Sequence, residues 1–185
     1  MRGFFRALLT GASLTVGAAA WAEEPPVPRM LPCFEIEDVQ PDHTALELAG
    51  AVRSCVEAGR HGDGMAIFIA FNSYSLFDQQ RVRDETAHEI LTELNQWIFN
   101  GMGKDDIDVL RRHAETLRLG DSAYQDRICN ALWAVGPPSY RPSYMIAFGQ
   151  MPRKGDDDWQ VDGFDAEVAW KVAVGEKNRC GDARL

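Results

Sequence analysis

The chain has 185 residues, of which 45% are hydrophobic, 10% aromatic and 25% charged, and its formal net charge at pH 7 is −9. This length fits one domain with a single core, and the aromatic content is high enough that the chain should fold rather than stay disordered. The acidic balance argues against a nucleic-acid binder, because phosphate contacts need Lys and Arg, and it disfavours docking on anionic lipid. It suits a basic protein partner, through electrostatic steering, and it suits plain solubility equally well.

Residues 1–22 predict an export signal. Arg2 and Arg6 form a short basic start, and the apolar run from Ala7 to Ala20 is too short to span a bilayer comfortably. Ala20-Trp21-Ala22 then places small residues at the two positions that a signal peptidase reads. We therefore expect a signal peptide cleaved near Ala22 and a mature chain outside the cytoplasm that does not insert into the membrane. An N-terminal helix of the fold is the alternative. Cleavage would remove two basic residues and no acidic one, which leaves a formal charge of −11.

The next stretch, 23–41, contains five prolines and predicts an extended lead-in to a single helical domain over 42–185. Asp42 is a good N-cap for a first helix, in which apolar residues recur at three- and four-residue spacing as far as Val56. Gly59 is its expected stop. A second helix, apolar on nearly all sides and therefore central, is predicted from about Met65 to Leu76.

Three more helices follow with the same spacing of apolar residues. They are predicted over 78–100, from Asp105 or Asp106 to Gly120, and from a cap at Asp121 or Ser122 to Gly136. Helices joined by short turns predict an all-α fold, an irregular bundle or a stack of α-hairpins with about five to six helices.

The pattern changes after Gly136. Three prolines make 137–144 unsuitable for a helix, and Met145–Phe148 is predicted as a short extended piece. Residues 154–159 predict an exposed acidic loop. The last segment, 164–174, is predicted as a helix that begins at Asp165, with a strand as the alternative because valines recur at Val168, Val172 and Val174.

Four cysteines, Cys33, Cys55, Cys129 and Cys180, are an even number in a chain predicted to be exported, which predicts two disulfides. Of the three connectivities we favour Cys33–Cys55 with Cys129–Cys180. The segment 32–41 is long enough to run back along the helix that carries Cys55, and the second bond would staple the C-terminal segment to the bundle. A catalytic or metal-binding thiolate is the alternative, but none of these cysteines lies in a Cys-x-x-Cys or Cys/His cluster.

The proline- and tyrosine-rich segment 137–144 is a candidate partner-binding surface. Prolines lower the entropy of a loop, and Tyr and Arg are frequent binding hot spots, so we expect Tyr140, Arg141 and Tyr144 to recognise a partner. The competing interpretation is that the segment packs across the bundle, so that its tyrosines fill core gaps with their hydroxyls satisfied.

The acidic loop is a second candidate for partner binding. Asp156, Asp157 and Asp158 are followed by Trp159, which predicts an acidic prong with an aromatic anchor for a basic hollow in a partner. A solvated turn is the competing interpretation.

No pattern points to catalysis or to a cofactor. Glu85 and His88 have the i, i+3 spacing of di-iron bundles, but there is a single copy among surface charges, so a solvated helix face is the default. Nucleophile elbow, Ser/His/Asp arrangement, phosphate loop and zinc signature are all missing. We therefore expect no catalytic residue, no metal site and no cofactor. A hydrolase or other enzyme with an unrecognised site is the alternative.

The whole mature chain, an exported, acidic and helical protein with few cysteines, resembles a known class. Three stretches carry the likeness most, Phe77–Asp84, Trp97–Gly101 and Gly136–Met145. The chain resembles the periplasmic immunity proteins that Gram-negative bacteria make against type VI secretion effectors, especially those paired with phospholipase D-type lipases.

That resemblance implies a protein that neutralises a toxic effector by occluding its active site or its membrane-docking face. A phospholipase D-type site holds lipid phosphate with His and Lys, so an acidic protein suits its electropositive mouth. The alternative is a periplasmic helical adaptor or scaffold that binds an endogenous protein partner.

Overall fold

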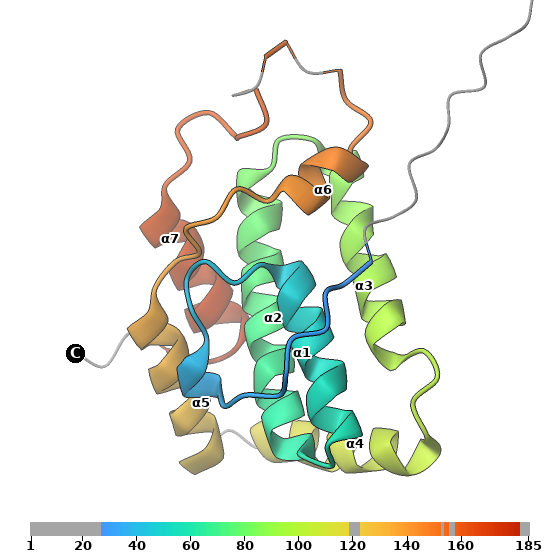
Figure 1. The fold of residues 1–185 in the computed structure, drawn as a ribbon. Helices are drawn as coiled ribbons and strands as arrows, with labels where there is room; N and C mark the ends of the chain where they lie inside the picture. Colours follow the sequence, from blue (N-terminus) through green and yellow to red (C-terminus); the bar gives the residue numbers. More distant parts are fainter. Residues whose placement is uncertain (1–26, 119–122, 153, 156–157, 182–185) are drawn as a thin grey trace, which may run out of the picture.

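The computed structural model describes residues 27–118, 123–152, 154–155 and 158–181, so the predicted signal peptide lies outside the described residues. The fold is all-α, as predicted, and the described part contains no strand (Figure 1). Its seven α-helices are α1 (Ala45–Glu57), α2 (His61–Arg81), α3 (Ile90–Phe99), α4 (Lys104–Arg118), α5 (Ala123–Val135), α6 (Ser143–Phe148) and α7 (Ala166–Lys171). Short 3₁₀ turns, η1 (Ile36–Asp38) and η2 (Glu85–Glu89), and a π-helix, η3 (Val172–Lys177), complete it.

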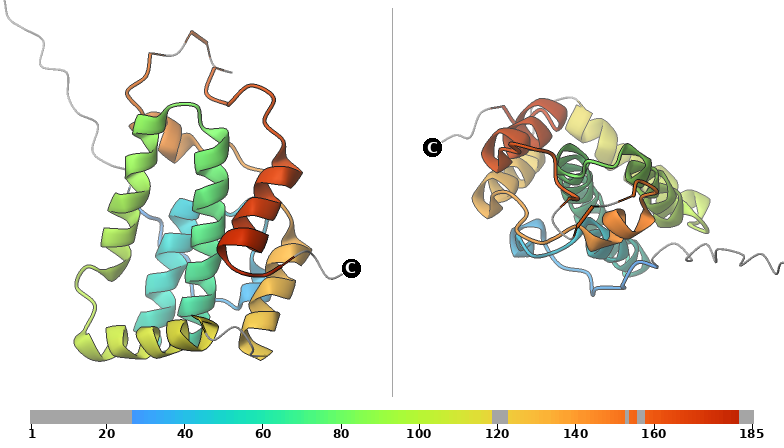
Figure 2. Two further views of the ribbon diagram at one scale, coloured as in Figure 1. Left: turned by 180° about the vertical axis from the view of Figure 1, so that it is seen from behind. Right: turned by 90° about the horizontal axis from the view of Figure 1, so that it is seen from above.

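Helix α2 is the centre of the bundle, as its apolar composition predicts. It pairs with α1 as a helical hairpin, and α3 lies on one side of this pair while α5 and α7 lie on the other (Figures 1 and 2). Helix α4 lies across one end of the hairpin, and α6 lies at the opposite end. Within the described residues, no helix is both long and apolar enough to cross a membrane.

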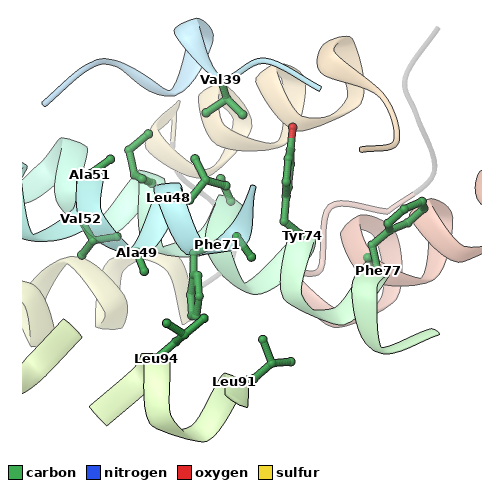
Figure 3. Close-up of a cluster of buried hydrophobic side chains, with 14 of the residues drawn as sticks. Val39, Leu48, Ala49, Ala51, Val52, Phe71, Tyr74, Phe77, Leu91 and Leu94 are labelled. Atoms are coloured by element: carbon green, nitrogen blue, oxygen red, sulfur yellow. The ribbon is translucent and has the colours of Figure 1, made fainter. Parts of the chain in front are cut away.

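Large side chains of α2 fill the core, while α1 contributes mostly small ones. Phe71, Tyr74 and Phe77 are at most 1% exposed, and they point away from the helix axis toward different neighbours (Figure 3). On α1 the buried positions include Ala49 and Ala51.

The first helix begins two residues later than predicted. Thr44, not Asp42, is its N-cap: the Thr44 hydroxyl accepts from the Glu47 N–H at 3.1 Å, and the Glu47 carboxylate accepts from the Thr44 N–H at 3.0 Å. This reciprocal pair is a capping box, which Asp42 cannot form with this spacing. The predicted stops at Gly59 and Gly136 are confirmed by positive φ angles of 71° and 73°. The proposed stop at Gly120 and caps at Asp121 or Ser122 lie outside the described residues.

The predicted single helix over 78–100 is wrong. Helix α2 continues to Arg81, the chain is extended at Val82, and a new start at Asp84 leads through η2 into α3. Val82 forms an isolated antiparallel bridge with Gln160, and the Asp84 carboxylate accepts from the Thr86 N–H at 3.0 Å. These non-helical hydrogen bonds replace the helical ones, which the apolar spacing could not reveal.

The predicted extended piece at Met145–Phe148 is also wrong, because helix α6 begins at Ser143, directly after Pro142. The Pro142 carbonyl accepts from the N–H groups of Met145 and Ile146, both at 3.0 Å. A proline at a helix start lacks only an N–H that would be unpaired there anyway. The helix predicted from Asp165 is confirmed: its carboxylate caps α7, and the chain continues into η3, so the strand alternative is wrong.

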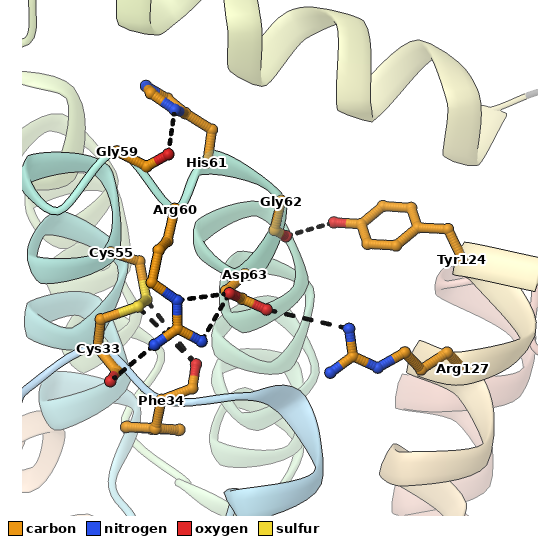
Figure 4. The surroundings of a disulfide bond; sticks show 10 residues. All are labelled: Cys33, Phe34, Cys55, Gly59, Arg60, His61, Gly62, Asp63, Tyr124 and Arg127. Carbon is orange, nitrogen blue, oxygen red and sulfur yellow. Dashed lines mark hydrogen bonds and ion pairs between the residues drawn. A yellow bond between two sulfur atoms is a disulfide. The ribbon is translucent and has the colours of Figure 1, made fainter.

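Both disulfides form with the pairing that we favoured, Cys33–Cys55 and Cys129–Cys180. The first ties the lead-in to α1, beside a network in which Arg60 ion-pairs with Asp63 (Figure 4). The lead-in lies against α1: a Cβ added at Gly50 would stand 2.0 Å from the Arg29 carbonyl oxygen. Only glycine at this position allows so close an approach.

Candidate partner-binding site

A buried carboxylate at the end of α2 organises the region that the sequence singles out. Asp78 is fully buried, and its Oδ2 accepts from the hydroxyls of Tyr140 at 2.6 Å and Tyr144 at 2.7 Å. Its Oδ1 lies 2.6 Å from Nη2 of Arg81, one helical turn further along. The Tyr140 hydroxyl also accepts from the Ala45 N–H at 3.1 Å, which joins the start of α1 to the same cluster.

Burial controls the electrostatics of this cluster. Desolvation raises the pKa of the Asp78 carboxyl, and the Arg81 charge and the tyrosine hydroxyls oppose that rise. The pKa values of Tyr140 and Tyr144 are raised well above 10 by burial and by the Asp78 charge, so both hydroxyls remain donors. The Arg81 guanidinium lies over the rings of Phe77 and Tyr140, 4.8 Å from each centroid. The Asp78–Arg81 pair fixes the positions of the side chains around it. None of them can rotate away without leaving a buried polar group unpaired.

The structure therefore places the tyrosines of the proline-rich segment inside the molecule. Tyr144 is 7% exposed and Tyr140 is half-buried, with both hydroxyls satisfied, which corresponds to the competing interpretation of this segment. Arg141 is the exposed member of the three, and its guanidinium lies 5.6 Å from the ring centroid of Trp159. Of the three candidates, Arg141 is the one that faces solvent.

Asp84 fastens the chain that leaves α6. Its carboxylate accepts from the Met151 N–H at 2.6 Å, and the neighbouring Thr86 hydroxyl accepts from the Gln150 N–H at 2.9 Å. Gly149 fits against this clasp so closely that an added Cβ would stand 2.3 Å from Asp84 Oδ2. Burial raises the pKa of Asp84, but the hydrogen bonds from Thr86 and Met151 outweigh it and hold the pKa below its usual range.

The acidic loop is fastened from its other end. Asp156 and Asp157 lie outside the described residues, whereas Asp158 is half-buried, 3.3 Å from Nη1 of Arg83, and accepts from the Lys154 N–H at 3.1 Å. Arg83 also donates to the Gln160 carbonyl at 2.9 Å and binds the exposed Asp162.

Trp159 belongs to this anchoring system as well. Its ring is half-buried, packs against the core cluster and faces the Arg81 guanidinium at 6.0 Å. Asp158 and Trp159 thus hold the loop onto the bundle in this structure, and they do not project from it as a free prong.

We call the described residues of 149–164 the loop face. Two of the few large apolar side chains that are exposed in the described chain lie on it, Met151 at 47% and Val161 at 39%. Beside Val161 is an open hollow of about 710 Å³ that is also lined by Arg83, Lys154 and Asp162. Exposed apolar side chains among charged ones, on a backbone fastened from both ends, make the loop face the candidate surface for a protein–protein contact.

A polar hollow of about 460 Å³ lies at the α2 N-terminus. Figure 4 shows some of its lining residues, among them Arg60, Asp63 and Tyr124. His61 Nε2 lies 2.8 Å from Asp106 Oδ1, and the Tyr124 hydroxyl donates to the Gly62 carbonyl. Burial raises the pKa of Tyr124 to about 12. The residues lining this hollow include no Ser, Thr or Cys. Its polar groups link α2, α4 and α5.

The Glu85/His88 pair is not arranged as a metal site. Glu85 is exposed, and the His88 Nε2 lies 3.1 Å from the Val82 carbonyl oxygen. Among the described residues, no group of three or more His, Cys, Asp and Glu side chains could hold a metal ion.

Sequence reasoning missed the residues that organise this end of the bundle: Asp78, Arg81, Arg83 and Asp84. One signal was available, because Asp78 and Arg81 are an i, i+3 charge pair at the end of a helix that is otherwise apolar.

No protein-family model, curated protein or solved structure matches this chain.

Proposed function

We propose that this chain is a periplasmic immunity protein, which binds a toxic secreted effector of a type VI secretion system and neutralises it. The observation that carries the proposal is the loop face. It exposes Met151 and Val161 beside charged side chains, and Asp84 and Arg83 fasten its backbone to the bundle. A surface ordered before binding loses little conformational entropy on binding, which favours a tight and long-lived complex.

The charge of the chain supports a basic partner. An excess of acidic side chains speeds the encounter with an electropositive surface and disfavours partners of the same sign. A phospholipase of the D type is the effector that fits best, because His and Lys that hold a lipid phosphate make its active-site mouth electropositive. The immunity protein would occlude that mouth or the neighbouring membrane-docking face, without any chemistry of its own.

The two disulfides agree with an exported protein, since such bonds persist in oxidising compartments. They also limit the conformations of both the lead-in and the loop face. Export through the predicted signal peptide would place the protein where an effector delivered to the periplasm acts.

The test is capture followed by inhibition. The oxidised protein is immobilised, envelope and secreted fractions of the producing cell are passed over it, and retained proteins are identified and assayed for phospholipase activity. We expect one secreted effector to be retained and its lipase activity to be inhibited by the soluble protein.

The loop face is tested with a matched pair of variants. Met151→Ser with Val161→Ser removes its two exposed apolar side chains, and Met30→Ser removes one of similar exposure, 46%, from the lead-in. We expect the double variant to bind the effector at least roughly tenfold more weakly, since exposed apolar anchors at an interface contribute about 1–2 kcal/mol each, and the lead-in variant to bind like wild type. Retention of housekeeping envelope proteins would support the adaptor instead, and an effector that both variants bind equally would move the contact elsewhere on the molecule.

A further inference from the structure

Helix α4 has little buried contact with the bundle. Of its fifteen residues, all of them within the described part of the chain, only Leu110 is buried. Leu110 joins Val56 and Met65 in a small apolar cluster, and the half-buried Phe68 and Phe99 border both this cluster and the main core. None of the buried side chains described for the main core comes from α4. The main core can therefore stay closed when α4 moves.

The chain is fastened on both sides of α4. Before it, Nη1 of Arg53 donates to the Asn100 carbonyl at 3.1 Å, which fixes the end of α3 to α1. Gly101 follows with a φ of 79°, and the space where its Cβ would stand is open, so this turn is not packed against other elements. Beyond α4, the Tyr124 hydroxyl donates to the Gly62 carbonyl and holds α5 against α2. Helix α4 is thus a segment between two fixed points.

The polar and aromatic contacts that join α4 to the other helices lie near the surface. Nε2 of His61 lies 2.8 Å from Oδ1 of Asp106, and both side chains are partly exposed. The His113 ring contacts the Tyr124 ring, with 5.8 Å between the ring centroids. An ion pair in such a position contributes little to stability, because water competes for both partners. Helix α4 carries no cysteine, so neither disulfide restrains it directly.

From these observations we propose that α4 is a cover that opens while the other helices stay folded, and that its opening uncovers Val56 and Met65. A segment with few buried contacts opens at a lower free energy than the core, and the elements of a protein that move are drawn from such segments. A helix of fifteen residues is only marginally stable by itself in water, so α4 should lose its helical hydrogen bonds when it leaves the bundle. Because α4 lies at the end of the bundle opposite α6, the proposal does not rest on the loop face or on an effector.

Native-state hydrogen exchange of the oxidised, ¹⁵N-labelled protein, followed by NMR, measures this opening amide by amide. We expect the α4 amides to share one opening free energy, with protection factors at least roughly tenfold below those of the slowest α2 amides. They should also respond weakly to low guanidinium concentrations, because a local opening exposes little surface. Equal protection and equal denaturant dependence in α4 and α2 would overturn the proposal, and so would a gradient of protection along α4, which is the mark of fraying.

Variants then separate the opening of α4 from unfolding of the whole chain. Ile90→Val removes a methyl group from the main core, so it should lower the protection of the slowest α2 amides roughly two- to tenfold and leave that of α4 unchanged. Asp106→Asn weakens the contact with His61 and should lower α4 protection roughly two- to fivefold. Asp105→Asn is its matched control, since it removes the neighbouring carboxylate of the same first turn. A loss of α4 protection in Ile90→Val equal to that of α2, or equal effects of the two aspartate variants, would contradict the proposed cover.

Discussion

The buried Asp78 side chain binds three other side chains at once. Its two oxygens receive a buried arginine and two tyrosine hydroxyls, which belong to α2, to the proline-rich segment and to α6. The tyrosines that the sequence suggested for partner recognition instead donate their hydroxyls to Asp78 inside the bundle. A substitution in this cluster should therefore act on stability first, and on binding only through the position of the loop.

The two tyrosine hydroxyls are predicted to contribute unequally. Tyr144→Phe removes one hydrogen bond to a charged group and should lower the free energy of unfolding by about 1.5–3 kcal/mol. Tyr140→Phe removes an equivalent bond and also leaves the buried Ala45 N–H without its acceptor, so it should cost about 1 kcal/mol more. Urea denaturation of the two variants measures the difference, and equal losses would show that the Ala45 N–H finds another acceptor.

For single residues, the sequence indicated which side chains matter better than it indicated whether they are buried or exposed. It favoured the cysteine pairs that form, because the segment 32–41 is long enough to reach back to Cys55, and it identified the unusual composition of 137–144. It could not decide whether Tyr140 and Tyr144 face solvent or core, since both are amphipathic and nothing local signals the buried Asp78 that receives them. Buried polar partners far apart in sequence are visible only in three dimensions.

Among the elements, the helix ends at Gly59 and Gly136 and the helix start at Asp165 were predicted correctly, whereas the chain breaks made by side-chain hydrogen bonds were not. The break between α2 and η2 depends on Asp84, whose carboxylate reaches the main chain at Met151. The start of α6 depends on a proline that reads equally well as the end of a helix and as its beginning. Both of these unpredicted boundaries, the break after α2 and the start of α6, lie at the end of the bundle that carries the loop face.

The Asp84 clasp predicts a pH dependence. Because the folded-state pKa of Asp84 is depressed, its stabilising effect is present above the ordinary carboxyl pKa, about 3.9, and is lost as the pH falls through the lower folded value. The free energy of unfolding of Asp84→Asn should therefore lie below that of wild type by a constant amount, about 1–2 kcal/mol, from pH 7 to near pH 4.5.

Below that pH the two proteins should converge, as the wild-type carboxylate becomes protonated and loses its charge-assisted hydrogen bonds. Guanidinium denaturation at a series of pH values gives both curves. Glu37, whose pKa is lowered by its hydrogen bond with Arg127, titrates alike in both proteins and cancels in the difference. A gap that widens toward acid pH would contradict the proposed role of the Asp84 charge.

For the molecule as a whole, each disulfide closes a loop of the chain, and the two loops differ in size. Their sequence separations of 22 and 51 predict contributions of about 3.5 and about 4 kcal/mol through the entropy of the unfolded chain. Cys129→Ser with Cys180→Ser should thus destabilise the protein more than Cys33→Ser with Cys55→Ser. Thermal and chemical denaturation of the two double variants give the order, and its reversal would point to strain or residual structure in place of loop entropy.

The larger of these closed loops has a consequence for survival in a compartment that contains proteases. The loop face and α7 lie between Cys129 and Cys180, and the peptide bond between the exposed Lys154 and Gly155 is open to a trypsin-like enzyme. A single cut there leaves both pieces joined through the disulfide, with α7 and Trp170 still packed against α2. The nicked protein should migrate as one band without reductant and as two bands with it, and it should keep its fold until the thiols are reduced.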